Sequence, residues 1–308
     1  MKLMKPTLFL TSLILPVLPA SALEPDVNQG EVELNLRYQA GKTYVSKMIS
    51  KNSSKIQMGG QKMNNEQTMT MEFTMKVDAI EDSENVKATV TYDRIAMDMV
   101  AMGQKMSFDS ADPASLAGNP MAGLAAMAGK SLTMTISPEL KFSDIKGMDK
   151  LFEGLGPEAE LAKGMFSEDQ MAQMMGAQMA QMLPGKKIKA GDRWPYKVEL
   201  PMGPMGNFAV DGKNKMKGVV AEQTARLAVI EFEATMKTKK GAGEIEPGMN
   251  MEVKDGKMKG TYHFNLADGY VSKTTSETTM TLEMVMPGAE EQMKIPTVSK
   301  VTMTTTMK

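Results

Sequence analysis

The sequence predicts a mainly β protein of the α+β class, in which one large antiparallel sheet curves into a half-barrel. About twelve stretches alternate apolar and polar residues, which is the period of a half-buried strand. The stretch of about 147–185 follows a helical period instead. Two similar stretches, Gln39–Tyr44 and Lys189–Trp194, each open a run of strands. We therefore expect two related β halves, 31–146 and 189–308, with helices from the middle of the chain against the concave face.

The first residues have the features of a secretion signal. Lys2 and Lys5 give a positive start, Leu8–Leu18 is apolar, and the small residues Ala20-Ser21-Ala22 fit a cleavage site. The apolar run is too short to span a bilayer. We expect cleavage after Ala22, a single β-rich domain over 23–308, a periplasmic or secreted location and no integral membrane segment.

The composition argues against several classes of function. A formal net charge of −1 provides no basic face for nucleic acid, and without cysteine there is neither a disulfide nor a lipidation site after the signal. No glycine-rich phosphate loop follows a predicted strand, and no spacing of His or Asp suggests a metal or other cofactor. The unusual feature is 35 methionines, against 9 phenylalanines, 6 tyrosines and 1 tryptophan.

The first β half begins with the alternating segment Val32–Tyr38, which predicts a strand. Met69–Val77 alternates most clearly, with threonines and charged residues on its other face. The apolar parity changes after Tyr92, so we expect a bulge at Asp93-Arg94. Residues 112–129, rich in Ala, Gly and Met, predict at most short helical turns.

The middle of the chain predicts two helices. Pro157 suits the first turn of a helix over about 158–165. Ser167-Glu168-Asp169-Gln170 is a capping box with acidic residues where the helix dipole favours them, and Leu183-Pro184-Gly185 ends the second helix. One face of this second helix carries methionines at helical spacing: Met171, Met174, Met175, Met179 and Met182.

The second β half opens with Trp194, which is followed by an inward position at Tyr196. We expect Trp194 to be buried as the first inward residue of its strand. Asp211-Gly212 and Asp255-Gly256 carry the signature of hairpin turns. Between these two pairs, Arg226–Met236 predicts a well-buried strand.

The residues that could support catalysis are few. His263 is the single histidine, and its strand phase places it on the outer, exposed face. Glu231 and Glu233 share a strand face and could imitate a pair of catalytic carboxylates, but Leu227 and Val229 on the same face favour a partly solvated edge. We expect no enzymatic activity.

The methionines allow three interpretations. They can pack a core, since methionine fills irregular gaps, or they can line an apolar groove that accepts varied partners. They can also bind Cu(I), which thioethers favour, although His and Cys are nearly missing. For the groove, the expected apolar lining comes from two predicted strands and the second helix: Met69, Met71, Phe73, Met75, Met171, Met174, Met175, Met179, Met280, Leu282 and Met284.

Three short motifs carry a resemblance: Gly191-Asp192-Arg193-Trp194, Gly269-Tyr270-Val271 and Ile136-Ser137-Pro138-Glu139. They resemble an uncharacterised family of secreted bacterial β-rich proteins with a Gly-Asp-x-Trp stretch. More loosely, the predicted architecture is similar to periplasmic lipoprotein and lipid carriers of the LolA type. The resemblance implies export and the β architecture, and it assigns no catalytic or binding residue.

From these observations we expect a binding or carrier protein of the bacterial envelope. Its partner would be an apolar ligand, either a lipid or a lipidated protein. The alternatives are a structural or interaction module without a small ligand and, third, a methionine-based Cu(I) binder.

Overall fold

The computed structural model describes residues 25–28, 30–58, 61–101, 104–119, 122–153, 167–201, 207–222, 225–239, 250–285 and 293–308. The strands are β1 (Thr43–Met58), β2 (Gln61–Ile80), β3 (Val86–Ala101), β4 (Gln104–Asp109), β5 (Ser131–Ile136), β6 (Phe142–Lys146), β7 (Arg193–Pro201), β8 (Asn207–Glu222), β9 (Ala225–Thr238), β10 (Asn250–Asn265), β11 (Tyr270–Val285) and β12 (Met293–Met307). The helices are η1 (Pro113–Leu116), α1 (Ala122–Ala125), α2 (Met148–Phe152) and α4 (Glu168–Ala180).

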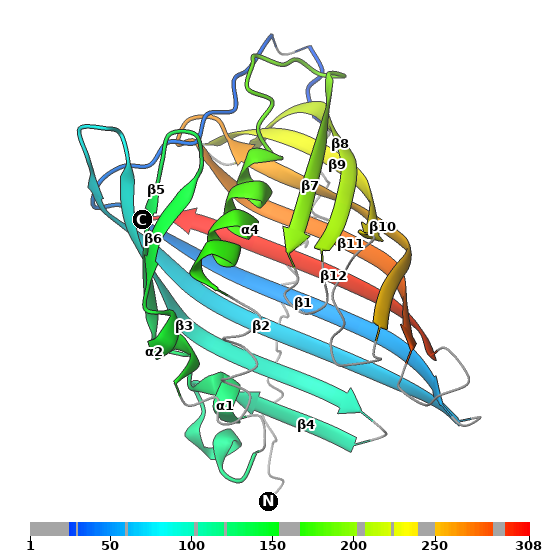
Figure 1. Ribbon diagram of the computed structural model, residues 1–308. Coiled ribbons are helices and arrows are strands. Elements are labelled where there is room, and N and C mark those ends of the chain that lie inside the picture. Colours follow the sequence, from blue (N-terminus) through cyan, green and yellow to red (C-terminus); the bar gives the residue numbers. More distant parts are fainter. Residues whose placement is uncertain are drawn as a thin grey trace, which may run out of the picture.

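Within these residues the strands form one antiparallel sheet of 12 strands. Its order is β6-β5-β3-β2-β1-β12-β11-β10-β9-β8-β7, and β4 pairs with the last part of β3. The sheet is strongly curved, and the described helices all come from the middle of the chain (Figure 1). The predicted fold class is confirmed.

The sheet order reflects the two halves that the sequence predicts. The strands of the first half follow one another from β1 at the centre of the sheet to β6 at one edge. Those of the second half follow one another from β7 at the other edge to β12 at the centre, where β12 pairs with β1. Gly41 and Gly191, which precede β1 and β7, have φ of 80° and 93°, a left-handed conformation that glycine adopts without strain. Trp194 is then the first buried residue of its strand, as expected, with 7% of its surface exposed, and Tyr44 has the same place in β1 with 3% exposed.

Two further local predictions are confirmed. Glu72 of β2 lies opposite Arg94 and Phe73 lies opposite Tyr92, so Asp93 is the extra residue of a bulge. At the start of α4, the Ser167 hydroxyl accepts from the Gln170 backbone N–H at 3.1 Å, and the Gln170 side chain accepts from the Ser167 N–H at 3.0 Å. The signal segment and the helix predicted over about 158–165 lie outside the described residues.

Helix α4 packs against both edge strands of the sheet, β6 on one side and β7 on the other (Figure 1). Gly176 faces the first half, because a Cβ there would lie 3.2 Å from the Leu140 carbonyl oxygen. Ala177 packs in the other direction, against the cluster of Tyr196 and Val198 on β7. The sheet therefore curves around α4, and the face that carries this helix is the concave one.

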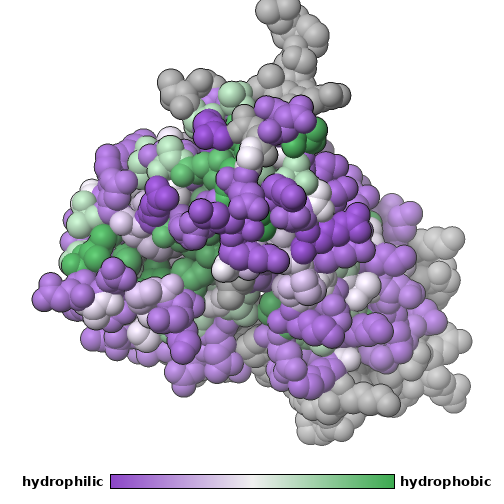
Figure 2. Space-filling model, turned by 90° about the horizontal axis from the view of Figure 1, so that it is seen from above, coloured by the Kyte–Doolittle hydropathy of each residue, from purple (hydrophilic) through white to green (hydrophobic). Residues whose placement is uncertain are grey.

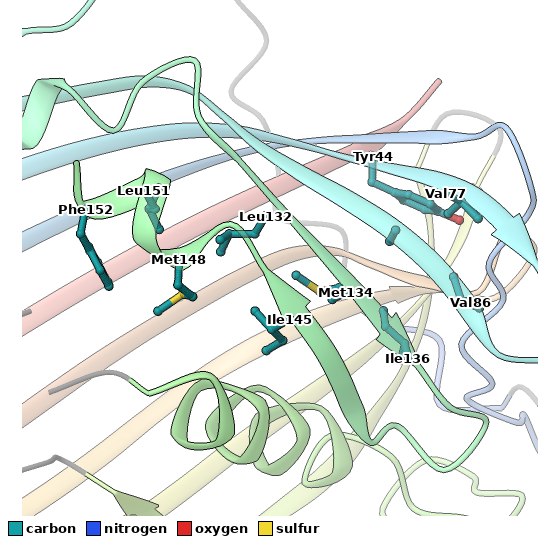
Figure 3. Close-up of a cluster of buried hydrophobic side chains, with 11 residues drawn as sticks. Tyr44, Val77, Val86, Leu132, Met134, Ile136, Ile145, Met148, Leu151 and Phe152 are labelled. Carbon is teal, nitrogen blue, oxygen red and sulfur yellow. The ribbon is translucent and has the colours of Figure 1, made fainter. Parts of the chain in front are cut away.

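Two large apolar clusters lie near the end of the sheet where β1 begins and β12 ends. The first joins Tyr44 and Val77 to residues of β3, β5 and β6 and to α2, where Met148 and Leu151 point into it (Figure 3). The second surrounds Trp194 in the other half. Seen from above, hydrophobic residues lie between hydrophilic ones (Figure 2). Full burial of a large apolar side chain stabilises a fold by about 1.5–3 kcal/mol. Because most of the clustered buried side chains lie at this end of the sheet, it is the main source of stability.

The strand predicted over Val32–Tyr38 is wrong, although its alternation is meaningful. This segment is extended, and its backbone–backbone contacts include an isolated bridge from Val32 to Ile188 and a hydrogen bond from the Arg37 N–H to the Gly269 carbonyl oxygen, neither of which forms a strand ladder. It crosses the ends of the strands and inserts Leu34, which is 3% exposed, into the Trp194 cluster. Alternating burial therefore arises here without a neighbouring strand.

The hairpin turns predicted at Asp211-Gly212 and Asp255-Gly256 are also wrong, because both pairs lie inside long strands. Gly212 instead lies beneath the ring of Tyr196, so that a Cβ there would collide with it. Asp255 has φ of 50° and sits in a bulge between Lys254 and Lys257. Both glycines serve close packing on the sheet rather than a reversal of the chain.

The convex face is charged and well registered. Across it, charges alternate on five neighbouring strands, and the ion pairs measure 2.6 Å for Lys213–Glu233, 3.0 Å for Lys259–Glu277 and 3.2 Å for Lys300–Glu277. Such exposed pairs contribute little stability, but a one-residue slip would break all of them and invert the faces. Among the described residues, no helix is long and apolar enough to cross a membrane.

Candidate ligand-binding site

Apart from Met284, whose side chain is outside the described residues, the residues predicted to line a groove lie on the concave face or on α4, but they are spread apart. On β2, Met69 and Met71 pack against the cluster of Ile95 and Phe108, whereas Met75 packs against the Tyr44 cluster. Phe73, between them, is half-buried and belongs to neither of these clusters. The β2 part of the prediction thus combines core packing with one partly accessible ring.

The methionine face of α4 also divides. Met171 and Met175 pack against the Tyr44 cluster, and Met182, just beyond the helix, packs against the Trp194 cluster. Met174 and Met179 are half-buried and belong to none of the described apolar clusters. Core packing and a partly accessible surface therefore occur on the same helix.

On β11 the predicted residues lie away from the helix. Met280 and Leu282 are half-buried, and Leu282 lies opposite the buried Val253 of β10. The side chain of Met284 lies outside the described residues. Since β1 and β12 separate β2 from β11, about 14 Å lies between these two groups at the usual strand spacing. The structure does not bring the eleven predicted residues together.

A cavity of about 210 Å³ lies between the C-terminal part of α4 and the strands β7–β11. Its apolar lining comprises Met182, Val198, Val210, Phe232 and Met258. Its polar lining comprises Gln178, Gln181, Tyr196, Asn214, Tyr262, Thr274 and Ser276. Gln178 is exposed, so the cavity is accessible to solvent beside the helix. We take this cavity as the candidate site.

Two buried polar side chains attach the end of α4 to the cavity wall. The Tyr262 hydroxyl donates to the Met182 carbonyl oxygen at 2.6 Å, and the Asn214 amide donates to the Gln181 carbonyl oxygen at 2.8 Å. Helix ends leave carbonyl groups without helical partners, and these two bonds satisfy them. Tyr262 is 1% exposed and Asn214 2% exposed. Burial raises the pKa of Tyr262, so its hydroxyl stays protonated and able to donate.

Two glycines make room for the cavity. Tyr196 lies opposite Gly212, and Phe232 lies opposite Gly260, each pair on neighbouring strands. A Cβ on Gly212 would come within 2.6 Å of the Tyr196 hydroxyl oxygen, and one on Gly260 would be 2.5 Å from the Phe232 ring. Because the glycines have no side chain, both rings lie low against the sheet instead of rising into the space under α4.

Among the described residues, no group of acidic, histidine or cysteine side chains could hold a metal ion. His263 faces the convex side, as predicted, but is half-buried. Burial lowers its pKa, and the positive charge of Lys273 lowers it further. Glu231 and Glu233 form ion pairs with Lys217 and Lys213, so their face is solvated as expected. The edge position expected for them is wrong, because β9 lies between β8 and β10 in the sheet.

The methionines form one further arrangement on the concave face. Met48 of β1 lies directly opposite Met71 of β2 and Met303 of β12, so three methionines occupy adjacent positions on three neighbouring strands. All three are half-buried. Directly opposite residues on neighbouring strands have Cβ atoms about 4.5–5.5 Å apart, which brings these thioethers within reach of one another.

The polar lining of the cavity was missed by the sequence interpretation, as was Met258. A signal for it exists: Thr274 and Ser276 have the same strand phase as Met280 and Leu282, so they had to face inward. Polar residues in the inward phase of a strand indicate a wet or ligand-filled interior. Asn214, between Lys213 and Lys215, gives no comparable signal.

The sequence pattern of DUF6263, described as a family of unknown function, matches residues 83–271. The chain belongs to this family. The DUF6263 match extends from the turn before β3 to the beginning of β11, and it includes α4 and every cavity residue except Thr274 and Ser276. No curated protein sequence matches the chain.

Several solved structures are similar in part. A structure of lipovitellin, solved to describe its lipid–protein interactions, matches with 9% identity and a TM-score of 0.48. The match covers 88% of this chain but only 26% of the lipovitellin chain. An outer membrane channel from Pseudomonas putida F1 matches with 7% identity and a TM-score of 0.22, over 91% and 100% of the two chains. A DUF1329 family protein from Desulfovibrio piger has 8% identity and a TM-score of 0.16, over 88% and 86%. At these TM-scores none of the matches carries a functional argument.

Proposed function

We propose that this DUF6263 protein is an exported, non-enzymatic binding or carrier protein for an apolar ligand, a lipid or a lipidated partner. The observation that carries the proposal is the cavity under α4, because a helix held over a concave sheet with space beneath it is a typical ligand site. Elsewhere on the concave face, Phe73, Met280 and Leu282 are also half-buried apolar residues.

The location is part of the proposal. The predicted signal at residues 1–22 favours a periplasmic or secreted protein. N-terminal sequencing of the protein recovered from the periplasm should begin at Leu23. Recovery of intact Met1 would refute export by this signal.

The test of binding is the analysis of molecules that accompany the folded protein. Ser276, half-buried on β11, lines the cavity, so Ser276→Phe should fill it. Thr279→Phe is the matched control, because Thr279 lies on the same strand in the opposite phase. Mass spectrometry of organic extracts should find apolar molecules with the wild type and with Thr279→Phe, but not with Ser276→Phe. Empty extracts from all three proteins, together with no binding of an apolar fluorescent probe, would favour the interaction module without a small ligand.

A second candidate function is Cu(I) binding, and the row of Met71, Met48 and Met303 favours it. Thioether ligands prefer Cu(I), and side chains on neighbouring strands of a concave face converge toward one point. Titration with Cu(I) under reducing conditions, against a chromophoric chelator, should then give one site. Met48→Leu should abolish it, while Met280→Leu should leave it intact. Equal behaviour of the two variants would exclude this row as the site.

A further inference from the structure

The lining of the cavity separates it from the charged surface of the protein. None of its described lining residues carries a charge, although amides and hydroxyls are abundant. On β8 the alternation is direct: Asn214 faces the cavity, and its neighbours Lys213 and Lys215 face the convex side. The same alternation separates Ser276 from Glu277 on β11. The sheet thus keeps its charges on one face and presents uncharged polar groups on the other.

The lack of charged lining residues limits which chemical groups of a ligand can enter the cavity. A carboxylate, phosphate or ammonium group transferred into the cavity would lose water and find no opposite charge, which is strongly unfavourable. A hydroxyl, ester or amide would instead meet hydrogen-bonding groups of both kinds. A side chain of the cavity wall shows the same preference for an uncharged group. Burial raises the pKa of the Tyr196 hydroxyl to about 12 and so disfavours its charged form.

The volume of the cavity limits how much of a ligand it holds. Pockets for whole drug-sized ligands measure about 300–1,000 Å³, and a cavity of about 150 Å³ holds one benzene ring. At 210 Å³, the space under α4 suits one ring or one head group. The rest of a longer molecule would lie outside the cavity, along the concave face. Met258 lines the cavity and is half-buried, so it could contact that part of the ligand.

We propose that the cavity under α4 binds the uncharged, hydrogen-bonding end of an amphiphilic ligand and excludes amphiphiles with a charged head group. This inference rests on the proposed function and specifies the class of ligand. A long-chain alcohol, a monoacylglycerol or a fatty amide belongs to the accepted class. A fatty acid anion or an alkylammonium belongs to the excluded one.

The experiment uses probes that share a ten-carbon chain and differ only at the head: decanol, decanoate and decyltrimethylammonium. All are used at pH 8, decanol below its solubility limit and the two ions below their critical micelle concentrations. Binding to the full-length mature protein is measured by calorimetry and by displacement of an apolar fluorescent probe. Decanol should bind more than about tenfold more tightly than either ion. Equal affinities of the three would overturn the inference but leave the proposed function standing, whereas no binding by any probe would count against the proposed function itself.

A pair of variants on α4 makes the result specific to the cavity. Gln178 is exposed and lines the cavity, and Gln173 is exposed on the same helix outside the described lining. Gln178→Lys should therefore fold normally and place an ammonium at the cavity, which should increase the affinity for decanoate several-fold and not that for decyltrimethylammonium. Gln173→Lys, with the same change in charge, should leave all affinities unchanged. If both variants increase decanoate binding equally, the effect is long-range attraction and the inference fails.

Discussion

The attachment of α4 to the sheet gives a direct test of how this half-barrel is closed. Tyr262 is 1% exposed, and its hydroxyl donates to the Met182 carbonyl oxygen at 2.6 Å. Tyr262→Phe removes only the hydroxyl and leaves the ring in place in the Trp194 cluster. The substitution therefore tests the hydrogen bond and not the packing.

The expected effect follows from the burial of the bond. A typical hydrogen bond contributes about 0.5–1.5 kcal/mol, and a buried carbonyl group left without a partner costs about 1–3 kcal/mol. Since Met182 is only half-buried, water compensates part of this loss, and we expect the lower half of that range. A loss of about 1–2 kcal/mol corresponds to an increase of roughly 5- to 30-fold in the population of the open helix.

Native-state hydrogen exchange measures this opening residue by residue. The amides of α4 should exchange roughly 5- to 30-fold faster in Tyr262→Phe, while those of β1 and β12 should keep their protection. Tyr196→Phe is the matched control, because it removes a hydroxyl of the same cavity that lies over Gly212. Unchanged exchange in α4, or an equal loss of protection throughout the sheet, would refute the view that this bond fastens the helix.

Three further predictions concern single residues. Trp194→Ala should lower the free energy of unfolding by about 3–5 kcal/mol, measured by urea titration, and an unchanged stability would contradict its place in the core. Because burial and then Lys273 lower the pKa of His263 below 6.5, unfolding takes up a proton below that pH. Stability should fall as the pH drops below about 6.5 and level off below the folded-state pKa, and His263→Gln should remove this dependence. Peroxide should oxidise Met174 before Met175, which packs against the Tyr44 cluster, and the reverse order by mass spectrometry would argue against their different packing.

Features set by nearest neighbours in the sequence could be predicted. The alternation of β2 and β9, the bulge at Asp93 and the Ser167 cap each depend on a few adjacent residues. Pairs such as Asp211-Gly212 were misinterpreted for the same reason. Two adjacent residues suggest a turn, but the need for glycine came from Tyr196 on the neighbouring strand.

Features set by contacts between distant segments could not be predicted. The alternation of Val32–Tyr38 predicted a strand. Alternation in a sequence shows which residues are buried, but it does not show whether a neighbouring strand pairs with the segment. Likewise, the contact of α4 with both β6 and β7 follows from the total curvature of the sheet. Curvature accumulates over all the strands, and it determines whether the edges come close enough for one helix to close the gap.

The same distinction explains why none of the eleven residues predicted to line a groove is among the described residues that line the cavity. Strand phase identified the concave face correctly, and apolar residues were then chosen on it because a ligand site was assumed to be apolar. The cavity lies instead where inward apolar residues such as Val198 and Met258 alternate with residues that are small or polar, as at Ser276 and Thr274, or with rings that lie low over glycine, as at Tyr196 and Phe232. Large apolar side chains fill space against their neighbours, and they gather in the clusters for that reason. In this curved sheet, inward polar residues next to an inward glycine are therefore the sequence feature that marks the position of the cavity.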